Sequence, residues 1–254
     1  MLRPRIIPSL LIHEKGLVKT KNFKKPRYVG DPINAVRIFN EKEVDELAIF
    51  DIDATLYKNE PDYDLIEKIA SQSRMPICYG GGVKNVDQAQ KISSLGIEKI
   101  AISSAAIDDP NLIAEMAKCI GKQSVVVVLD VKKRLLGGYD VFTHNGKKKR
   151  DVSVAKFIKE VDELGAGEII INSIDRDGEM KGYDLNLIDK IRSITSLPLT
   201  ILGGAGNLSH LKSVTEKYPI IGLAAGSMFV FKGKYKAVLI NYPSREEKKI
   251  VYQR

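Results

Sequence analysis

The 254-residue sequence predicts an α/β fold in which residues 1–254 form a single (β/α)8 barrel built from two half-barrels. Eight short apolar runs alternate with helix-forming segments, as in parallel strands joined by helices. Two of these runs end in glycine-rich turns, at 79–82 and 202–206. Four runs of the first half recur in the second at offsets of about 120 residues, which indicates a duplicated unit. A doubly wound sheet is the alternative fold, but it does not explain the four-by-four repeat.

The elements of the first half follow from periodicity and from capping residues. We expect strands over 5–12, 46–51, 75–79 and 99–103, and helices over 31–43, 61–73, 86–95 and 109–119. Asp31 and Pro32 give one helix an N-cap and a proline in the first turn, and Asp109 repeats this signal. The polar segment 14–30 is long for a connection in a compact domain, so we expect a functional lid there.

The second half repeats this order. We expect strands over 124–130, 168–172, 199–202 and 220–225, helices over 151–164, 184–194 and 208–217, and a final helix after Lys232. The run 124–130 is nearly all valine, which fits a parallel strand buried on both faces. A hairpin is expected over 135–145, because Gly137-Gly138 and Asn145-Gly146 are turn sequences.

Composition limits the classes of function. The hydrophobic fraction of 44% supports a large core, and no apolar run reaches the roughly 18 residues that cross a membrane. Residues 1–5 run directly into the first strand, so no signal peptide is expected. Cys78 and Cys119 are expected to be reduced packing residues. These features predict a cytoplasmic protein without a membrane partner.

The net charge of +8 favours an anionic small-molecule substrate with solvated basic loops. Two basic runs, 147–150 and 21–25, are loop-like and lack the interleaved aromatic residues that stack on bases. We therefore expect no nucleic-acid partner.

The predicted barrel fixes where the active site lies. In such barrels it is formed at the carboxyl ends of the strands. Here these ends supply carboxylates from several strands and the two glycine turns, on opposite sides of the barrel mouth. A strand, a glycine turn and a helix start present backbone N–H groups to an anion. The arrangement predicts a substrate with a phosphate group at each end.

Eight motifs carry a resemblance to one family. They are Arg5-Ile6-Ile7, Gly30-Asp31-Pro32, Asp45-Glu46-Leu47, Gly80-Gly81-Gly82, Gly165-Ala166-Gly167-Glu168-Ile169, Ser173-Ile174-Asp175-Arg176-Asp177-Gly178, Gly182-Tyr183-Asp184 and Gly203-Gly204-Ala205-Gly206-Asn207. In this order, over nearly the whole chain, they resemble the cyclase subunit of imidazole glycerol phosphate synthase, HisF. The resemblance implies a heterodimer with a HisH-like glutaminase, whose ammonia converts a bis-phosphorylated ribulosyl aminoimidazole carboxamide to imidazole glycerol phosphate and aminoimidazole carboxamide ribotide.

The resemblance also implies roles for individual residues, and it implies no metal and no cofactor. Asp130 matches one of two acid/base aspartates, and Lys19 matches the lysine of the flexible first loop. Gly82 and Ser104, with Ser103 at a position where the family has asparagine, match one phosphate site. The second phosphate site is matched by Asp177, Gly178, Gly204, Gly226 and Ser227. The gate through which ammonia enters is matched by Arg5, Glu46, Lys99 and Glu168, although opposite charges at a barrel mouth also form plain structural networks.

Three positions depart from the family pattern. Leu11 stands where the second acid/base aspartate belongs, and Cys78 replaces a threonine near the ammonia path, in addition to Ser103. General acid–base catalysis typically contributes 10²–10⁴-fold, so the loss of one aspartate puts ring closure in doubt. Either Asp130 carries the chemistry alone, or the chain is a non-cyclising ammonia conduit for a sugar amidotransferase of surface polysaccharide synthesis. The segments 19–32 and 231–243 resemble the latter subgroup. A sugar isomerase of histidine synthesis is disfavoured by Leu11 and by the gate.

Overall fold

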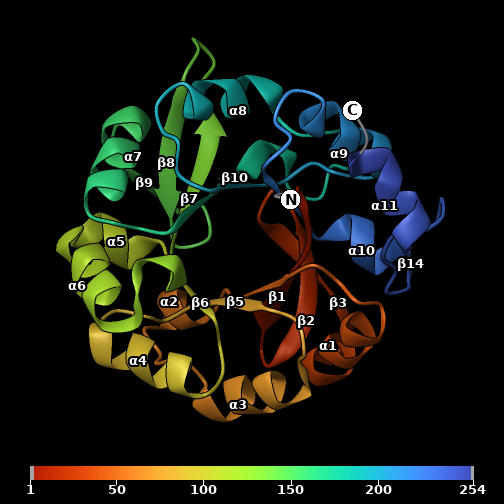
Figure 1. Cartoon of the computed structure of the whole chain (residues 1–254), viewed down its shortest axis with the longest axis horizontal. Coiled ribbons are helices and arrows are strands. Elements are labelled where there is room, and N and C mark those ends of the chain that lie inside the picture. The colour runs from red at the N-terminus through yellow and green to blue at the C-terminus, as the bar shows by residue number, and fades with distance from the viewer. Residues whose placement is uncertain (1–2, 253–254) are drawn as a thin grey trace.

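The computed structural model describes residues 3–252, which form a closed barrel of parallel strands surrounded by helices (Figure 1). The four residues 1–2 and 253–254 of the expected domain lie outside this range. The barrel strands are β1 (Arg5–His13), β4 (Leu47–Asp51), β5 (Ile77–Gly80), β6 (Lys99–Ile102), β7 (Val125–Lys133), β10 (Glu168–Ser173), β11 (Leu199–Leu202) and β12 (Gly222–Ala225). Pairing of β7 with β10 and of β12 with β1 closes the ring. The predicted (β/α)8 barrel is confirmed.

The two halves of the barrel have matching elements. β7, β10, β11 and β12 begin 120 to 123 residues after β1, β4, β5 and β6, respectively. In each half the first strand is followed by two antiparallel strands, β2 (Gly16–Lys21) and β3 (Lys24–Gly30) after β1, and β8 (Tyr139–Thr143) and β9 (Lys148–Arg150) after β7. The offset seen in the sequence therefore corresponds to equivalent strands.

Helices cover the outside of the barrel. They are α1 (Pro32–Glu41), α2 (Ala54–Tyr57), α3 (Tyr63–Gln72), α4 (Val86–Ser94), α5 (Ser104–Asp108), α6 (Asn111–Ile120), α7 (Val154–Glu163), α8 (Leu185–Arg192), α9 (Leu208–Thr215), α10 (Ser227–Val230) and α11 (Arg245–Tyr252), with single 3₁₀ turns η1 (Lys122–Ser124) and η2 (Ile174–Arg176). Asp31 caps α1 by accepting from the Asn34 N–H, as predicted. Asp109 instead accepts from the Asn111 N–H, so α6 starts later than expected.

Three expectations need correction. Segment 14–30 is a β-hairpin, because its residues pair with the extended end of β1 (Leu11 with Val18) and with one another. β7 continues to Lys133 because β8 pairs with it. The small antiparallel pair β13 (Phe231–Lys232) and β14 (Ala237–Val238) follows α10, so the final helix begins only at Arg245.

The inward side chains form successive layers along the barrel axis, because alternate residues of each strand face the lumen. The layer at the amino ends of the strands is charged or polar and consists of Arg5, Glu46, Lys99, Glu168 and Thr200. The next layer is an apolar collar formed by Ile7, Ala48, Cys78, Ala101, Val126, Val128, Ile170, Leu202 and Ala224. A cavity follows at the carboxyl ends.

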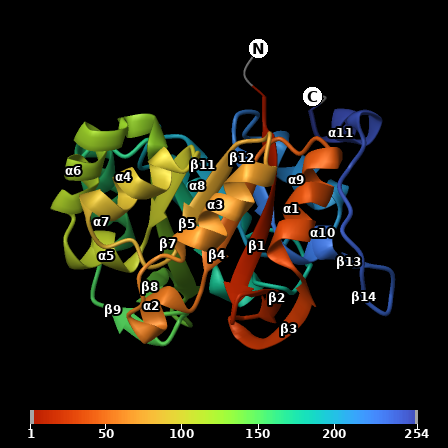
Figure 2. The same cartoon turned by 90° about the horizontal axis from the view of Figure 1, so that it is seen from below.

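The two faces of the barrel differ in what surrounds them. Figure 2 shows α2, β2, β3, β8 and β9 at one face and the two chain ends at the other. The hairpins therefore lie at the carboxyl ends of the strands. Among the described residues, no helix has the length and apolarity to cross a membrane.

Replacing Tyr183 with phenylalanine should destabilise the barrel. Tyr183 is buried and its hydroxyl donates to the Ala224 carbonyl oxygen of β12, 2.9 Å away. Loss of this hydrogen bond should lower the free energy of unfolding by about 1–2 kcal/mol. Urea unfolding measures the difference, with Tyr57→Phe as the control, because Tyr57 is 63% exposed. Equal destabilisation by both changes would contradict a stabilising role for the Tyr183–Ala224 hydrogen bond.

Candidate active site

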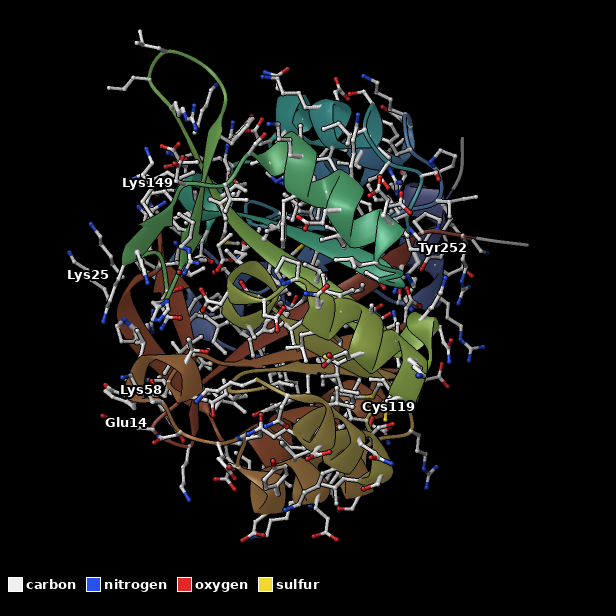
Figure 3. All side chains as sticks on the ribbon, turned by 90° about the vertical axis from the view of Figure 1, so that its left-hand side faces the viewer. Glu14, Lys25, Lys58, Cys119, Lys149 and Tyr252 are labelled. Carbon is white, nitrogen blue, oxygen red and sulfur yellow. The ribbon has the colours of Figure 1, made fainter. Side chains whose placement is uncertain are left out.

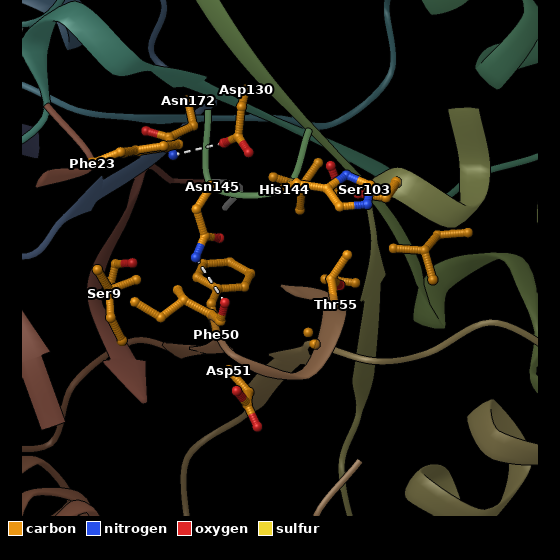
Figure 4. A pocket seen from close by; sticks show the side chains of 18 of the residues that line it. Ser9, Phe23, Phe50, Asp51, Thr55, Ser103, Asp130, His144, Asn145 and Asn172 are labelled. Carbon is orange, nitrogen blue, oxygen red and sulfur yellow. Dashed lines mark hydrogen bonds between the residues drawn. The ribbon is translucent and has the colours of Figure 1, made fainter. Parts of the chain in front are cut away.

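A cavity of about 150 Å³ opens at the carboxyl ends of the barrel strands (Figure 4). It is lined by residues from both halves of the chain, and the two hairpins contribute as well, through Lys19, Thr20 and Phe23 on one side and His144 and Asn145 on the other. Of the sequence-predicted site residues, the cavity brings together Lys19, Gly82, Ser103, Ser104, Asp130 and Asp177. Of the rest, Gly178 and Gly226 lie against the first hairpin, and the gate residues lie at the opposite end of the barrel.

Asp130 projects into this cavity from β7. The side-chain amide of Asn172, on the neighbouring strand β10, donates to Asp130 Oδ1 over 2.9 Å. Burial raises the pKa of Asp130 to about 7, although the hydrogen bond from Asn172 opposes this shift. A carboxyl group that titrates near neutral pH can both accept and donate a proton under physiological conditions.

Two other residues that line the cavity, Leu11 and Asp51, are less suited than Asp130 to transfer a proton. Leu11, at the end of β1, lines the same cavity with an apolar side chain. Asp51 accepts hydrogen bonds from the backbone N–H groups of Asp53 and Ala54, so its carboxylate holds the turn after β4. Burial raises the pKa of Asp51. Asp130 is therefore the better candidate for a proton-transfer group.

The first predicted phosphate site is open to the cavity. Gly82 adopts φ +75°, and a side chain there would press on Ala54 at 2.9 Å, so the turn admits only glycine without strain. Ser103 and Ser104 follow β6 and line the cavity beside this turn. The Ser103 hydroxyl is buried and has no hydrogen-bond partner among the described residues. A buried polar atom without a partner indicates a place for a ligand.

The second predicted phosphate site is covered by the β2–β3 hairpin. Thr20 Oγ1 donates to Asp177 Oδ2 over 2.6 Å, and the Asn22 N–H donates to the Asp177 carbonyl oxygen. A methyl group on Gly226 would overlap the Lys19 amino group, so this amine fills the space beside Gly226. Gly178, Gly204 and Ser227 likewise do not line the cavity.

Lys19 is buried in this position. Burial lowers the pKa of Lys19, and the charge of Asp177 partly offsets this effect. The side chain that the sequence places in a flexible loop therefore belongs to a folded hairpin here. It brings a cationic group to the site where an anion is expected.

The four charged gate residues meet at the other end of the barrel. Arg5 bonds Glu46 and reaches Glu168 over 2.6 Å, and Lys99 lies 2.8 Å from both carboxylates. Burial alone would raise the pKa of Glu168, but the charges of Arg5 and Lys99 hold it below its ordinary value. The four side chains thus form a closed, mutually neutralising ring.

Several residues of the cavity escaped the sequence analysis. Ser9 and Asn172 face the lumen, and Ser9 Oγ and Asn172 Oδ1 are buried without a partner among residues 3–252. Strand alternation could have identified Asn172, because it pairs directly with Asp130 in the register of β10 and β7. His144 and Asn145 had no such signal, since only the fold brings the β8–β9 turn to the cavity.

Positive charge is concentrated around the cavity. Residues 14–30 and 131–150 contain 13 of the 40 lysines and arginines but only two of the 32 acidic residues. The rest of the chain is therefore net negative. Figure 3 shows Lys25 and Lys149, from the two hairpins, toward one end of the molecule and Cys119 and Tyr252 toward the other. This basic rim favours approach of an anionic ligand.

Replacing Asp130 with asparagine should change how stability depends on pH. The pKa of Asp130 is about 7 in the folded chain, whereas that of an unfolded aspartate is about 3.9. Because the unfolded chain releases this proton first, wild-type stability falls as pH rises from about 4 to 7. The free energy of unfolding of Asp130→Asn should therefore rise by about 2–3 kcal/mol relative to that of wild type between pH 5 and 8.

Urea unfolding at the two pH values tests this expectation. Asp64→Asn is the matched control, because Asp64 is exposed on α3 and its replacement should leave the pH dependence unchanged. An Asp130→Asn effect of the same size at pH 5 and pH 8 would contradict a carboxyl group that titrates near neutral pH.

Comparison with known proteins places the chain among HisF proteins. Residues 5–236 match the family described as "Histidine biosynthesis protein". The chain is 57% identical over 250 residues to the "Putative imidazole glycerol phosphate synthase subunit hisF3" of Vibrio vulnificus, covering 98% of this chain and 96% of that protein. It is 39% identical over 232 residues to the imidazole glycerol phosphate synthase subunit HisF of a Thermotoga species, covering 91% of each chain. It is 37% identical over 229 residues to that of Streptococcus mutans, covering 90% and 91%.

The match spans the whole barrel, and the relatives are matched over nearly their full length. The order of strands, glycine turns and charged residues agrees with the resemblance seen in the sequence. The chain therefore belongs to the histidine-biosynthesis protein family, as an imidazole glycerol phosphate synthase subunit of the HisF type.

Proposed function

We propose that the chain is the synthase subunit of a glutamine amidotransferase complex and receives ammonia through its barrel from a HisH-like glutaminase. The observation that carries this proposal is the series of layers along one axis: a charged ring, an apolar collar and a cavity with a titratable carboxyl group. We place the complex in the cytoplasm, where Cys78 in the collar stays reduced.

The collar is suited to the passage of a small neutral molecule. Its side chains are apolar, and Cys78 is fully buried, so burial raises the pKa of its thiol well above the ordinary value. Ammonia can cross such a layer, whereas ammonium would lose its hydration without gaining a partner. At the entrance, the Lys99 amine lies between two carboxylates and its displacement would open the ring. The charged ring and the collar together would select ammonia over water and ions.

Asp130 is the group that we assign to proton transfer at the cavity. Its carboxyl group is held by Asn172 and has a pKa of about 7. It can take a proton from attacking ammonia and return one to the closing ring. A substrate phosphate at the second site requires the β2–β3 hairpin to shift, because Lys19 fills the space beside Gly226. After this shift the phosphate would take the space beside Gly226, and the Lys19 amine would lie next to the phosphate.

One observation favours a second function. Leu11 gives the cavity an apolar wall where a second proton-transfer group belongs. In addition, the identity of 57% to the Vibrio vulnificus protein exceeds the 37% to the HisF of Streptococcus mutans. Both findings support a separate subgroup. For this subgroup we propose that the barrel conducts ammonia to a sugar amidotransferase of surface polysaccharide synthesis without closing a ring.

A HisH-like glutaminase should bind at the amino ends of the strands, where the charged ring opens. Ile220 is 55% exposed two residues before β12, at this face. Ile220→Asp should weaken a one-to-one complex by about tenfold, because a charge replaces an apolar contact. Leu135→Asp is the control, because Leu135 is fully exposed at the tip of the opposite hairpin.

Analytical ultracentrifugation of the purified chain with a purified HisH glutaminase measures both affinities. The absence of any complex, with and without a bis-phosphorylated ligand, would overturn the partner assignment. Equal weakening by the two substitutions would overturn the assigned face.

Ring closure decides between the two functions. The isolated chain is supplied with ammonium and the bis-phosphorylated ribulosyl substrate, next to Leu11→Asp. If Asp130 acts alone, wild type turns over, and Leu11→Asp gains at most the 10²–10⁴-fold of one added proton-transfer group. If the chain is a conduit, wild type is inert and Leu11→Asp acquires turnover.

Asp130→Asn is the control for both wild type and Leu11→Asp, because it removes the carboxyl group that we assign to proton transfer. Turnover that survives in the Asp130→Asn chain would overturn the role assigned to Asp130. If both wild type and Leu11→Asp are inert, the cavity is not a cyclase site that lacks one carboxyl group. That outcome would contradict both proposed functions on this point.

A further inference from the structure

The chain has three histidines, and two of them have evident structural roles. His13 Nδ1 lies 2.8 Å from Asp53 Oδ1, at the end of β1. His210 Nδ1 accepts from the Gly206 N–H over 3.1 Å and so fixes the turn before α9. His144 lines the cavity, and within residues 3–252 its ring bonds only the adjacent Thr143 hydroxyl. Its second ring nitrogen is therefore available to a ligand.

The β8–β9 turn holds His144 in place at some cost in backbone strain. His144 and Asn145 both have φ +55°, which non-glycine residues rarely adopt. The Asn145 side chain donates to the Ile52 carbonyl oxygen over 2.7 Å, which ties the turn to the end of β4 (Figure 4). Gly146 packs against the ring of Phe23 from the other hairpin. The turn is thus fastened from both sides across the cavity.

The hydrogen bonds at Thr143 determine which ring nitrogen is free. His144 Nδ1 lies 3.0 Å from the Thr143 hydroxyl, whose oxygen lies 3.5 Å from the Lys148 carbonyl oxygen. When the hydroxyl donates to that carbonyl oxygen, it accepts from His144 Nδ1. Nε2 then carries a lone pair in the neutral ring and an N–H only in the imidazolium. A neutral ring repels an anionic oxygen at this position, whereas the imidazolium donates to it.

The surroundings of His144 favour an anion over a cation. Ser103 lines the same cavity, and its buried hydroxyl lacks a partner among the described residues. The other charged side chains that line the cavity are Lys19 on β2, Asp51 at the end of β4, Asp130 on β7 and Asp177 after η2. Asp51 and Asp177 already accept hydrogen bonds, from backbone N–H groups and from Thr20. Lys147, in the same turn, adds positive charge.

We propose that His144 is a further ligand of the phosphoryl group held by Gly82, Ser103 and Ser104, and that it binds this group only as the imidazolium. The inference rests on the proposed function for the phosphate site itself. It makes anion binding at this site stronger as pH falls, because only the protonated ring can donate a hydrogen bond through Nε2. The site would therefore retain a phosphorylated ligand more tightly in mildly acidic conditions.

Sulfate is the probe, because it remains a dianion between pH 6 and 8 and any pH dependence then belongs to the protein. Sulfate affinity is measured from the backbone amide NMR signals of Gly82 and Ser104 at both pH values. The wild-type chain should bind about tenfold more tightly at pH 6 than at pH 8, as expected for one charge-assisted hydrogen bond. The ring signals of the three histidines should show sulfate shifting the protonation of His144 alone.

Two variants complete the test. His144→Asn preserves the left-handed backbone, which asparagine adopts readily. In an Asp130→Asn background, where the cavity carboxyl group with a pKa of about 7 is removed, it should bind sulfate equally weakly at pH 6 and pH 8. His13→Gln is the matched control and should keep the tenfold dependence, because His13 does not line the cavity.

The outcomes separate this inference from the function on which it rests. Sulfate that leaves the Gly82 and Ser104 signals unmoved at both pH values would overturn the phosphate site as well as its His144 ligand. Sulfate that binds there with one affinity at both pH values would overturn only the role of His144. So would a pH dependence that survives in His144→Asn made in the Asp130→Asn background.

Discussion

Closure of the parallel strands into a ring is the constraint on which the other features depend. A closed ladder of hydrogen bonds leaves no free edge, and the alternation of each strand sends every second side chain into a narrow lumen. Residues such as Arg5 and Glu168, which are far apart in the chain, must therefore share one layer. The layer that results cannot be polar without internal pairing, and here four charges pair in a closed ring.

The same geometry distributes chemistry along the axis. Charges lie at the amino ends, apolar side chains follow, and polar groups without partners surround Asp130 at the carboxyl ends. The collar separates the two polar layers, and burial is the largest influence on the pKa of Asp130. The identity of the inward-facing residues thus determines both the stability of the barrel and the reactivity of its cavity.

The hairpins after β1 and β7 occupy equivalent places in the two half-barrels but bring different side chains to the cavity. The first bonds Asp177 and inserts Lys19 beside Gly226. The second brings His144 and Asn145 to the opposite wall. Both hairpins are rich in lysine and arginine, so the duplicated architecture concentrates positive charge around one mouth of the barrel. A substrate with two phosphate groups would meet a basic element at each end.

The sequence by itself determined the barrel, its duplicated halves and the candidate residues at strand ends, because periodicity, glycine turns and caps act over a few residues. It also located Asp130 and the departure at Leu11. Only the tertiary structure decided that segment 14–30 is a hairpin that bonds Asp177, that Asn172 bonds Asp130 and that His144 reaches the cavity. These contacts join residues that are distant in the chain. Their geometry depends on the register and closure of the whole ring, which no local pattern records.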